Sequence, residues 1–296
     1  MLSWCADMVE EIRRVSVIGF GTMGTGITQI IAQAGYEVVA RDVSDDLLRR
    51  GLEVIRSGPF GLEKAVQKGR ITRGEADAAL SRIRVTTDLA EAVRDADFVV
   101  EAVFENLEVK RKVFAEVDKL APRHALMVSN TSTLSITAIA SATSRPEKVA
   151  GMHFFNPAQV MKLVEVVRGI LTSDETVEAV RRFSEKLGKT PIIVNRDIPG
   201  FVANRIGIPG ILEAIRLYEE NVASARDIDN AMKLGYNWPM GPLELADLIG
   251  LDVLLDSAES IYAETRDPKY NPPVILKQMV RAGLLGRKVK KGFYTY

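Results

Sequence analysis

Short apolar runs alternate with longer amphipathic stretches through the first two thirds of the chain. The short runs predict buried strands at 13–20, 37–41, 98–103, 126–129, 149–154 and 192–194. Helical spacing separates them at 27–34 and between 44 and 82, where Gly58-Pro59 interrupts a long charged stretch. Because the first strand–helix–strand unit needs a crossover between parallel strands, this alternation predicts an open α/β sheet.

Beyond Pro199 the strand signals stop and helical spacing takes over. The pattern predicts helices at 201–220, 225–234, 243–260 and 274–282. A chain of 296 residues is long enough for two domains. We therefore predict an α/β domain over residues 1–196 and a smaller all-helical domain over 197–296.

Composition excludes several classes of protein. Lys plus Arg equals Asp plus Glu at 39 each, so bulk charge gives no support for nucleic-acid binding. No apolar run approaches the ~18–20 residues of a membrane span, and the opening stretch does not resemble a signal peptide, so we expect a cytoplasmic protein without membrane contact. Cys5 is the single cysteine and is expected to be a bystander. No zinc signature is present, and no metal is expected.

A glycine fingerprint lies between the first strand and the first helix. It reads Gly19-Phe20-Gly21-Thr22-Met23-Gly24. In such a loop the first glycine permits the tight turn, the second lets backbone approach a pyrophosphate, and the third allows close helix–strand packing. The helix N-terminus that follows supplies free N–H groups for phosphates. This arrangement predicts a dinucleotide site.

Asp42 indicates which dinucleotide binds. It follows the second strand, about 20 residues beyond the glycines, where the fingerprint expects a carboxylate on the ribose hydroxyls. That carboxylate would repel the 2′-phosphate of NADP, so NAD is the predicted cofactor. Arg41 beside it leaves NADP open as a minor alternative.

Two polar residues stand out in apolar surroundings downstream. His153 ends a predicted strand, at the edge of the sheet where ligands bind in open α/β folds. Glu165 lies within the otherwise mostly apolar run Met161–Val167, and a carboxylate in such a run needs a partner. A histidine base oriented by this carboxylate would satisfy both residues. A surface ion pair between Glu165 and Lys162 is the alternative.

Five segments resemble the L-3-hydroxyacyl-CoA dehydrogenase family, in the same order along the chain. They read SNTSTLSI, HFFNPAQVMKLVEVV, DIPGFVANRI, GYNWPMGPLELADLIGLD and GRKVKKGFYTY, and the resemblance extends from about Arg14 to Tyr296. It implies a Rossmann-type, mostly parallel sheet that binds NAD, followed by a helical domain that carries the contact of a homodimer. The implied reaction is reversible oxidation of an L-3-hydroxyacyl-CoA to a 3-oxoacyl-CoA.

The resemblance also implies residue roles. His153 would be the general base, Glu165 would orient it, and Ser132 and Asn204 would hydrogen-bond the substrate. Ser132 would also lie on the cofactor side, although Asn-Thr-Ser before a helix could simply be capping chemistry. Positions that match further cofactor contacts are Glu105, Lys110, Asn156 and Lys288.

The acyl-CoA site is the least defined part of this interpretation. Lys64 and Lys68, with Arg70 and Arg73, could meet the CoA phosphates or could form a solvated helix face. Two other functions stay open: an L-gulonate 3-dehydrogenase acting on a free hydroxy acid, and a catalytically silent protein of the kind found among lens crystallins. The complete set of Ser132, His153, Glu165 and Asn204 argues against silence, and the runs MKLVEVV and GRKVKKGFYTY favour a thioester substrate.

Overall fold

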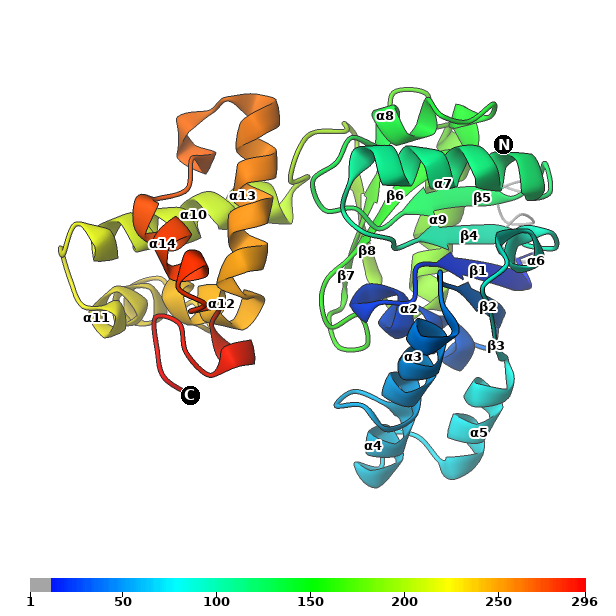
Figure 1. Cartoon of the computed structure of the whole chain (residues 1–296), viewed down its shortest axis with the longest axis horizontal. Coiled ribbons are helices and arrows are strands. Elements are labelled where there is room, and N and C mark those ends of the chain that lie inside the picture. The colour runs from blue at the N-terminus through cyan, green and yellow to red at the C-terminus, as the bar shows by residue number, and fades with distance from the viewer. Residues whose placement is uncertain (1–11) are drawn as a thin grey trace. The chain divides into compact units, whose positions relative to one another are not determined.

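The computed structural model describes residues 12–296, so Cys5 lies outside the described residues. The chain divides into two compact units, Met1–Asp197 and Ile198–Tyr296, which are described separately below. Figure 1 shows strands only in the first unit and helices throughout the second. No helix among residues 12–296 is long and apolar enough to cross a bilayer.

The first unit is built on one eight-stranded sheet in the order β3-β2-β1-β4-β5-β6-β7-β8. Every neighbouring pair is parallel except β6 and β7, which are antiparallel. The mostly parallel sheet predicted from the sequence is therefore confirmed. The strands are β1 (Arg14–Ile18), β2 (Glu37–Arg41), β3 (Ile83–Thr86), β4 (Phe98–Glu101), β5 (Leu126–Ser129), β6 (Val149–Phe154), β7 (Leu163–Val167) and β8 (Thr190–Val194).

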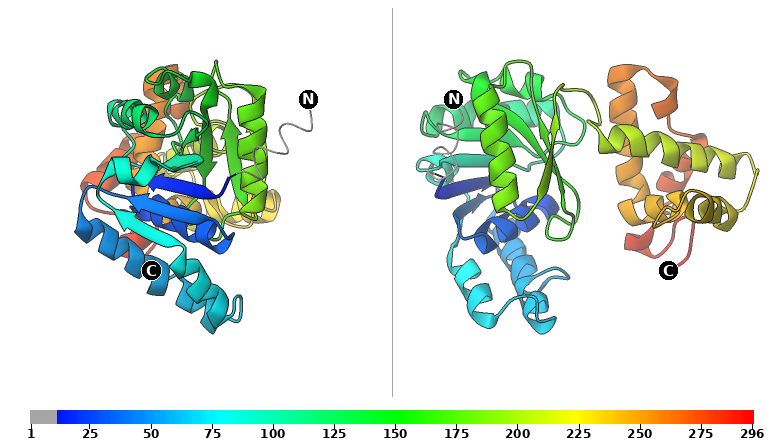
Figure 2. Two further views of the ribbon diagram at one scale, coloured as in Figure 1. Left: turned by 90° about the vertical axis from the view of Figure 1, so that its right-hand side faces the viewer. Right: turned by 180° about the vertical axis from the view of Figure 1, so that it is seen from behind.

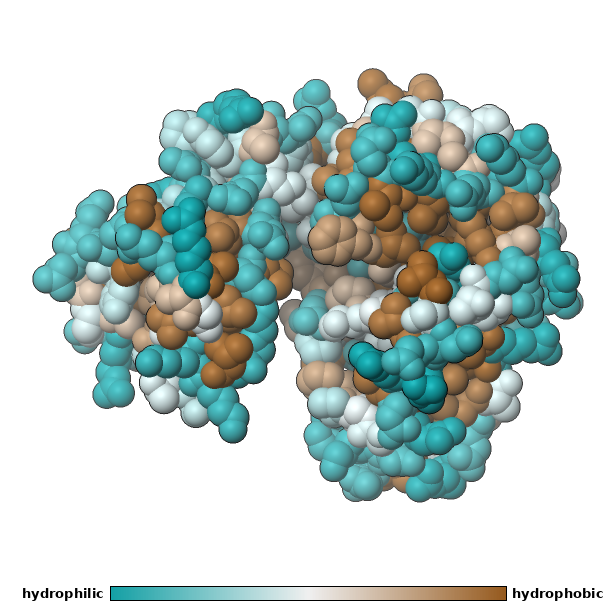
Figure 3. Space-filling view, viewed as in Figure 1, coloured by the Kyte–Doolittle hydropathy of each residue, from teal (hydrophilic) through white to brown (hydrophobic). Residues whose placement is uncertain are grey.

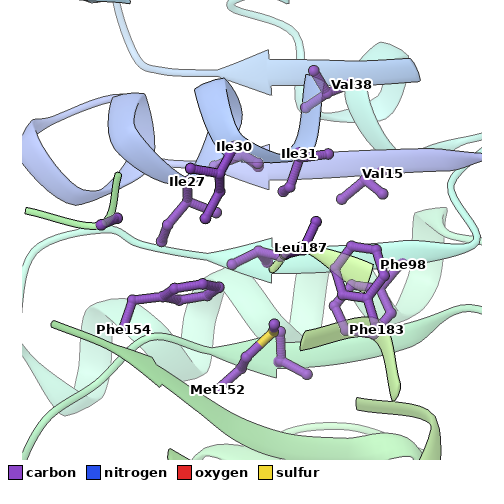
Figure 4. Packing of buried hydrophobic residues seen from close by; sticks show 14 of the residues in the cluster. Val15, Ile27, Ile30, Ile31, Val38, Phe98, Met152, Phe154, Phe183 and Leu187 are labelled. Atoms are coloured by element: carbon purple, nitrogen blue, oxygen red, sulfur yellow. The ribbon is translucent and has the colours of Figure 1, made fainter. Parts of the chain in front are cut away.

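Helices cover both faces of this sheet, as parallel strands joined by crossovers require. On one face α2 (Thr22–Gln33) and α9 (Asp174–Lys186) bury their apolar sides against the strands. Figure 4 shows this layer, in which the rings of Phe98 and Phe183 lie 4.4 Å apart. The opposite face carries α7 (Leu107–Leu120) and α8 (Ile136–Ala140), and the two sides can be compared in Figures 1 and 2. The short helix α6 (Leu89–Val93) precedes β4.

The charged stretch 44–82 forms three helices instead of two. They are α3 (Asp45–Ser57), α4 (Leu62–Gln67) and α5 (Arg73–Ser81). The second break has a local cause: Thr72 caps α5 by accepting from the Glu75 amide, and the Glu75 carboxylate accepts from the Thr72 amide at 2.7 Å.

The second unit consists of helices and short helical turns around its own apolar core, with isolated β-bridges only near its C-terminus. The predicted helix 243–260 is wrong in one respect, because Gly250 adopts a φ of +101° and separates two helices. The predicted helix 225–234 ends at Asn230 and continues as a wider turn, Ala231–Gly235. The helices are α10 (Ala203–Glu219), α11 (Ala225–Asn230), α12 (Pro242–Ile249), α13 (Leu251–Thr265) and α14 (Val274–Arg281).

Candidate active site

The glycine loop follows β1 at the carboxyl edge of the sheet. Gly19 has a φ of +99°, and a Cβ there would lie 2.5 Å from the carbonyl oxygen of Ala102. At Gly24 a Cβ would lie 1.8 Å from the carbonyl oxygen of Gly19, so helix and loop approach this closely only through glycine. Gly21 faces open space, since a Cβ there would meet no atom within 4 Å. The Gly21 backbone is therefore open to a ligand.

The start of α2 offers amide groups to that space. Thr22 and Met23 are the first two residues of the helix, and the Thr25 amide makes a helical bond to the Gly21 carbonyl at 2.9 Å. The amides of residues 22–24 consequently have no partner within the helix. Free N–H groups and the positive end of the helix dipole together fit a pyrophosphate.

Asp42 stands beside the same loop, immediately after β2. Its carboxylate accepts from the Phe20 amide at 2.7 Å and from the Val43 amide at 2.6 Å. A carboxylate has about four lone-pair sites, so these two bonds leave capacity for ribose hydroxyls. Arg41 is turned aside, because its Nε donates to the Thr87 carbonyl at 3.2 Å. The loop, the helix start and Asp42 together fit a dinucleotide.

His153 and Glu165 form a buried pair on adjacent strands. They face each other in the antiparallel register of β6 and β7, and His153 Nδ1 lies 2.7 Å from Glu165 Oε2. Glu165 is 0% exposed and His153 is 5% exposed. The alternative surface pair of Glu165 with Lys162 is therefore wrong. The carboxylate thus holds the ring through Nδ1, as a carboxylate that orients a catalytic imidazole does.

The strand ends around His153 are tied together. Asn130, which follows β5, accepts through Oδ1 from the Phe154 amide at 2.9 Å, and the ring of Phe155 packs 4.5 Å from the His153 ring. Ser132 lies two residues beyond Asn130, and its amide donates to Glu105 at 3.0 Å. Since β5 and β6 are parallel neighbours, Ser132 and His153 leave the sheet at the same edge. Ser132 is not the helix cap, because Ser135 caps α8.

Comparison with known proteins identifies the family of the chain. The model of the NAD-binding domain of 3-hydroxyacyl-CoA dehydrogenase matches residues 14–198, and the model of that family's C-terminal domain matches residues 200–296. The chain belongs to the 3-hydroxyacyl-CoA dehydrogenase family. It is an NAD-dependent oxidoreductase, and the nucleotide loop described above fits that cofactor.

Several relatives are similar over nearly the whole length of this dehydrogenase. A probable 3-hydroxybutyryl-CoA dehydrogenase of Bacillus subtilis (strain 168) is 46% identical, covering 97% of this chain and 98% of its own. The mitochondrial hydroxyacyl-coenzyme A dehydrogenase of Homo sapiens is 43% identical, covering 96% and 91%. The crystal structure of (S)-3-hydroxybutyryl-CoA dehydrogenase from Ralstonia eutropha is 44% identical with a TM-score of 0.90, covering 97% and 99%.

Two predicted cofactor residues of the dehydrogenase belong to one ionic network, which is buried at Lys110 and exposed at Glu105. Glu105 follows β4 and accepts from the Ser132 amide and the Thr131 hydroxyl, while Lys110 on α7 approaches it at 3.2 Å. Lys110 also contacts Glu101, a fully buried carboxylate that the sequence analysis missed. A signal was available, because Glu101 ends the apolar run Phe98–Val100 much as Glu165 interrupts its own strand.

Three of the predicted site residues are an exposed loop residue and two residues of the second unit. Asn156 is exposed in the loop after β6. Asn204 lies on α10 and Lys288 in the turn Arg287–Val289, both in the second unit, and Lys288 forms an ion pair with Asp252. Their roles in the site remain predictions.

The four cations proposed for CoA lie between the start of α4 and the start of α5, where Arg73 is the first residue. Lys64 and Lys68 are exposed, as are Arg70 and Arg73. Among residues 12–296, no group of three or more His, Cys, Asp and Glu side chains is placed to hold a metal ion.

Proposed function

We propose that this dehydrogenase oxidises L-3-hydroxyacyl-CoA thioesters to 3-oxoacyl-CoA, reversibly, with 3-hydroxybutyryl-CoA as a substrate. The buried His153–Glu165 pair, at the edge of the sheet that carries the nucleotide loop, is the observation that supports this chemistry most strongly. Relatives named 3-hydroxybutyryl-CoA dehydrogenase support the substrate class.

His153 would move the proton. In the oxidation direction its Nε2 accepts the proton of the 3-hydroxyl as the C3–H bond breaks and the C3–O bond gains double-bond character. Bound NAD supplies the acceptor for the hydride. The Glu165 carboxylate accepts from the Nδ1–H group, keeps the ring oriented, and stabilises the imidazolium that forms. In reduction, the same imidazolium returns its proton to the C3 oxygen.

Polar neighbours would hold the reacting oxygen. Ser132 follows β5 at the edge where β6 ends one residue after His153, so its hydroxyl would reach the C3 oxygen of a ligand that His153 contacts. The family resemblance implies that Asn204, on α10, also hydrogen-bonds the substrate. The pyrophosphate and the adenosine ribose would be held by Gly19, Gly21, Thr22, Met23, Gly24 and Asp42. Further cofactor contacts would come from Glu105, Asn156 and Lys288. Lys110 would act beside Glu105.

Lys64 and Lys68 would attract the phosphates of CoA. Both are exposed, and an anionic ligand of a chain with balanced charge needs local cations.

We also propose that the enzyme is a cytoplasmic homodimer that pairs through its second unit. Figure 3 shows apolar residues on the visible face of that unit. Several of its large apolar side chains are exposed, and Ile206 and Leu234 are 74% and 85% accessible. Apolar surface of this kind marks protein–protein contacts.

The substrate proposal is tested by following NADH absorbance with acetoacetyl-CoA and, separately, with L-gulonate. Turnover of acetoacetyl-CoA with a far smaller kcat/KM for L-gulonate is expected. A larger kcat/KM for L-gulonate than for acetoacetyl-CoA would establish a hydroxy-acid dehydrogenase. Absence of turnover with both substrates would contradict the proposed chemistry.

The CoA contact is tested with Lys64→Met and Lys68→Met. Each change should raise KM for acetoacetyl-CoA and leave KM unchanged for the acetoacetyl thioester of N-acetylcysteamine, which lacks the CoA phosphates. Lys112→Met, which removes an exposed lysine from α7, is the matched control. If KM for the CoA thioester is unchanged in both test variants, these lysines form a solvated face.

A further inference from the structure

A buried ionic network lies at the carboxyl ends of β4 and β5. Glu101 is 1% exposed and receives three donors: Lys110 Nζ at 2.7 Å, the Val103 amide at 2.7 Å and the Ser129 hydroxyl at 2.6 Å. A carboxylate out of water keeps its charge only when such donors surround it. Glu101 is therefore built into the sheet as an anion.

Lys110 links Glu101 to the surface of the site. Its side chain is 1% exposed, and its ammonium also lies 3.2 Å from Glu105 Oε2. Glu105 is 38% exposed, so this carboxylate is the member of the network that a ligand can reach. Its other oxygen accepts from the Ser132 amide at 3.0 Å and from the Thr131 hydroxyl. Glu101 therefore contributes its charge to the network without contacting a ligand itself.

The position of the network relates it to one half of the cofactor. Strand order reverses between β1 and β4, and dinucleotides bind across the point of reversal in such sheets. Asp42 after β2 marks the adenosine side. The nicotinamide half is consequently expected over the ends of β4 and β5, next to Glu105 and Ser132.

We propose that the Glu101–Lys110–Glu105 network favours the oxidised over the reduced cofactor. Two carboxylates and one ammonium leave the network with one net negative charge. The nicotinamide ring is positive in NAD⁺ and neutral in NADH, so a negative group beside it stabilises only the oxidised form. Glu101 is thus a positioning residue that contributes charge without touching the cofactor, and Glu105 is the contact through which the network acts.

The test measures the dissociation constants of NAD⁺ and NADH separately, by calorimetry and by NADH fluorescence, without substrate. Glu105→Gln and Glu101→Gln each make the network neutral. Each should raise the ratio of the NAD⁺ constant to the NADH constant about tenfold, the effect of one unit charge at several ångströms in a partly screened site.

Three controls separate charge from structure. Glu116→Gln removes an exposed carboxylate from α7, and Ser129→Ala removes one hydrogen bond to Glu101 without changing any charge. Both should leave the ratio at its wild-type value, although Ser129→Ala should lower the melting temperature. Glu105→Asp keeps the charge but shortens the side chain, so it should weaken both cofactor forms alike.

The proposal fails if Glu105→Gln leaves the ratio unchanged, whether or not both affinities fall together. A fall of both affinities at constant ratio would mean that Glu105 only binds hydroxyl groups. Should Glu101→Gln fail to fold, the comparison of Glu105→Gln with Glu105→Asp still decides the outcome. Because no acyl substrate is used, a failure here is distinguishable from a failure of the proposed substrate class.

Discussion

His153 Nδ1 and Glu165 Oε2 lie 2.7 Å apart because β6 and β7 run antiparallel and place the two residues directly opposite each other. Cross-strand neighbours have their Cβ atoms about 5 Å apart, so the sheet itself sets their separation. Phe155 packs against the imidazole from the loop side. The orientation of the proposed base is therefore fixed by a rigid element.

Replacing His153 should abolish most turnover. His153→Ala and His153→Gln should each lower kcat by about 10²–10⁴-fold, the usual contribution of a positioned general base. Steady-state kinetics with acetoacetyl-CoA and NADH would measure this, with NADH affinity as a check on folding. A variant that retains most of wild-type kcat would show that His153 is only structural.

Glu165→Gln should lower kcat more than it raises KM. The amide keeps the size of the side chain but removes the charge that stabilises the imidazolium. In the wild type, oxidation should accelerate with rising pH, because the neutral imidazole is the base, and reduction should accelerate with falling pH. The kcat/KM profiles in both directions, for wild type and Glu165→Gln, test this. Superimposable profiles with equal kcat would contradict a role for Glu165.

Asp42→Ala should weaken the preference for NAD over NADP. The carboxylate repels a 2′-phosphate, while Arg41 is already engaged with the Thr87 carbonyl. The ratio of kcat/KM values for the two cofactors measures the preference. Equal use of both cofactors by the wild type would mean that Asp42 does not select the cofactor.

The chain should form a two-fold symmetric homodimer. Ile206 on α10 and Leu234 after α11 remain exposed in the single chain, and burying such side chains stabilises an interface. Light scattering at micromolar concentration should give twice the mass of one chain. A monomer mass under these conditions would rule out the dimer.

Glu178→Gln should destabilise the first unit in a pH-dependent way. Hydrogen bonds from Arg181, opposed by burial and assisted by Arg182, lower the pKa of Glu178 from 4.5 to about 2. A lowered carboxyl pKa adds stability above its unfolded value, and that stability is lost as pH falls through the folded value. The variant should lose about 1 kcal/mol in free energy of unfolding at pH 7.

Urea denaturation between pH 7 and pH 3 would measure this difference, which should shrink toward the acid end. Glu116→Gln on α7 is the control with an exposed carboxylate. A difference that stays constant over this pH range would show that the carboxylate charge of Glu178 is not responsible.

Local patterns were sufficient for six of the eight strands and for the nucleotide loop, but not for the strands β3 and β7. The glycines from Gly19 to Gly24 and the carboxylate at Asp42 lie within one strand–helix–strand unit, so their spacing along the chain already fixes their spacing in the fold. The change from strand signals to helical periodicity near Pro199 is likewise local. The carboxylate of Glu165 in an apolar run also predicts a pairing with His153, and the family resemblance implies the same pairing.

Contacts between distant segments were decided only by the fold. The register of β6 against β7 makes His153, and not Lys162, the partner of Glu165. The packing of α7 on the sheet brings Lys110 to Glu101. Lys288 likewise forms an ion pair with Asp252 of the same unit, a residue distant from it in sequence. Periodicity encodes the face on which a side chain lies, but its partner depends on which strand or helix covers that face. The apolar run that Glu101 ends is a local signal for its burial, but its pairing with Lys110 follows from the packing of α7 on the sheet.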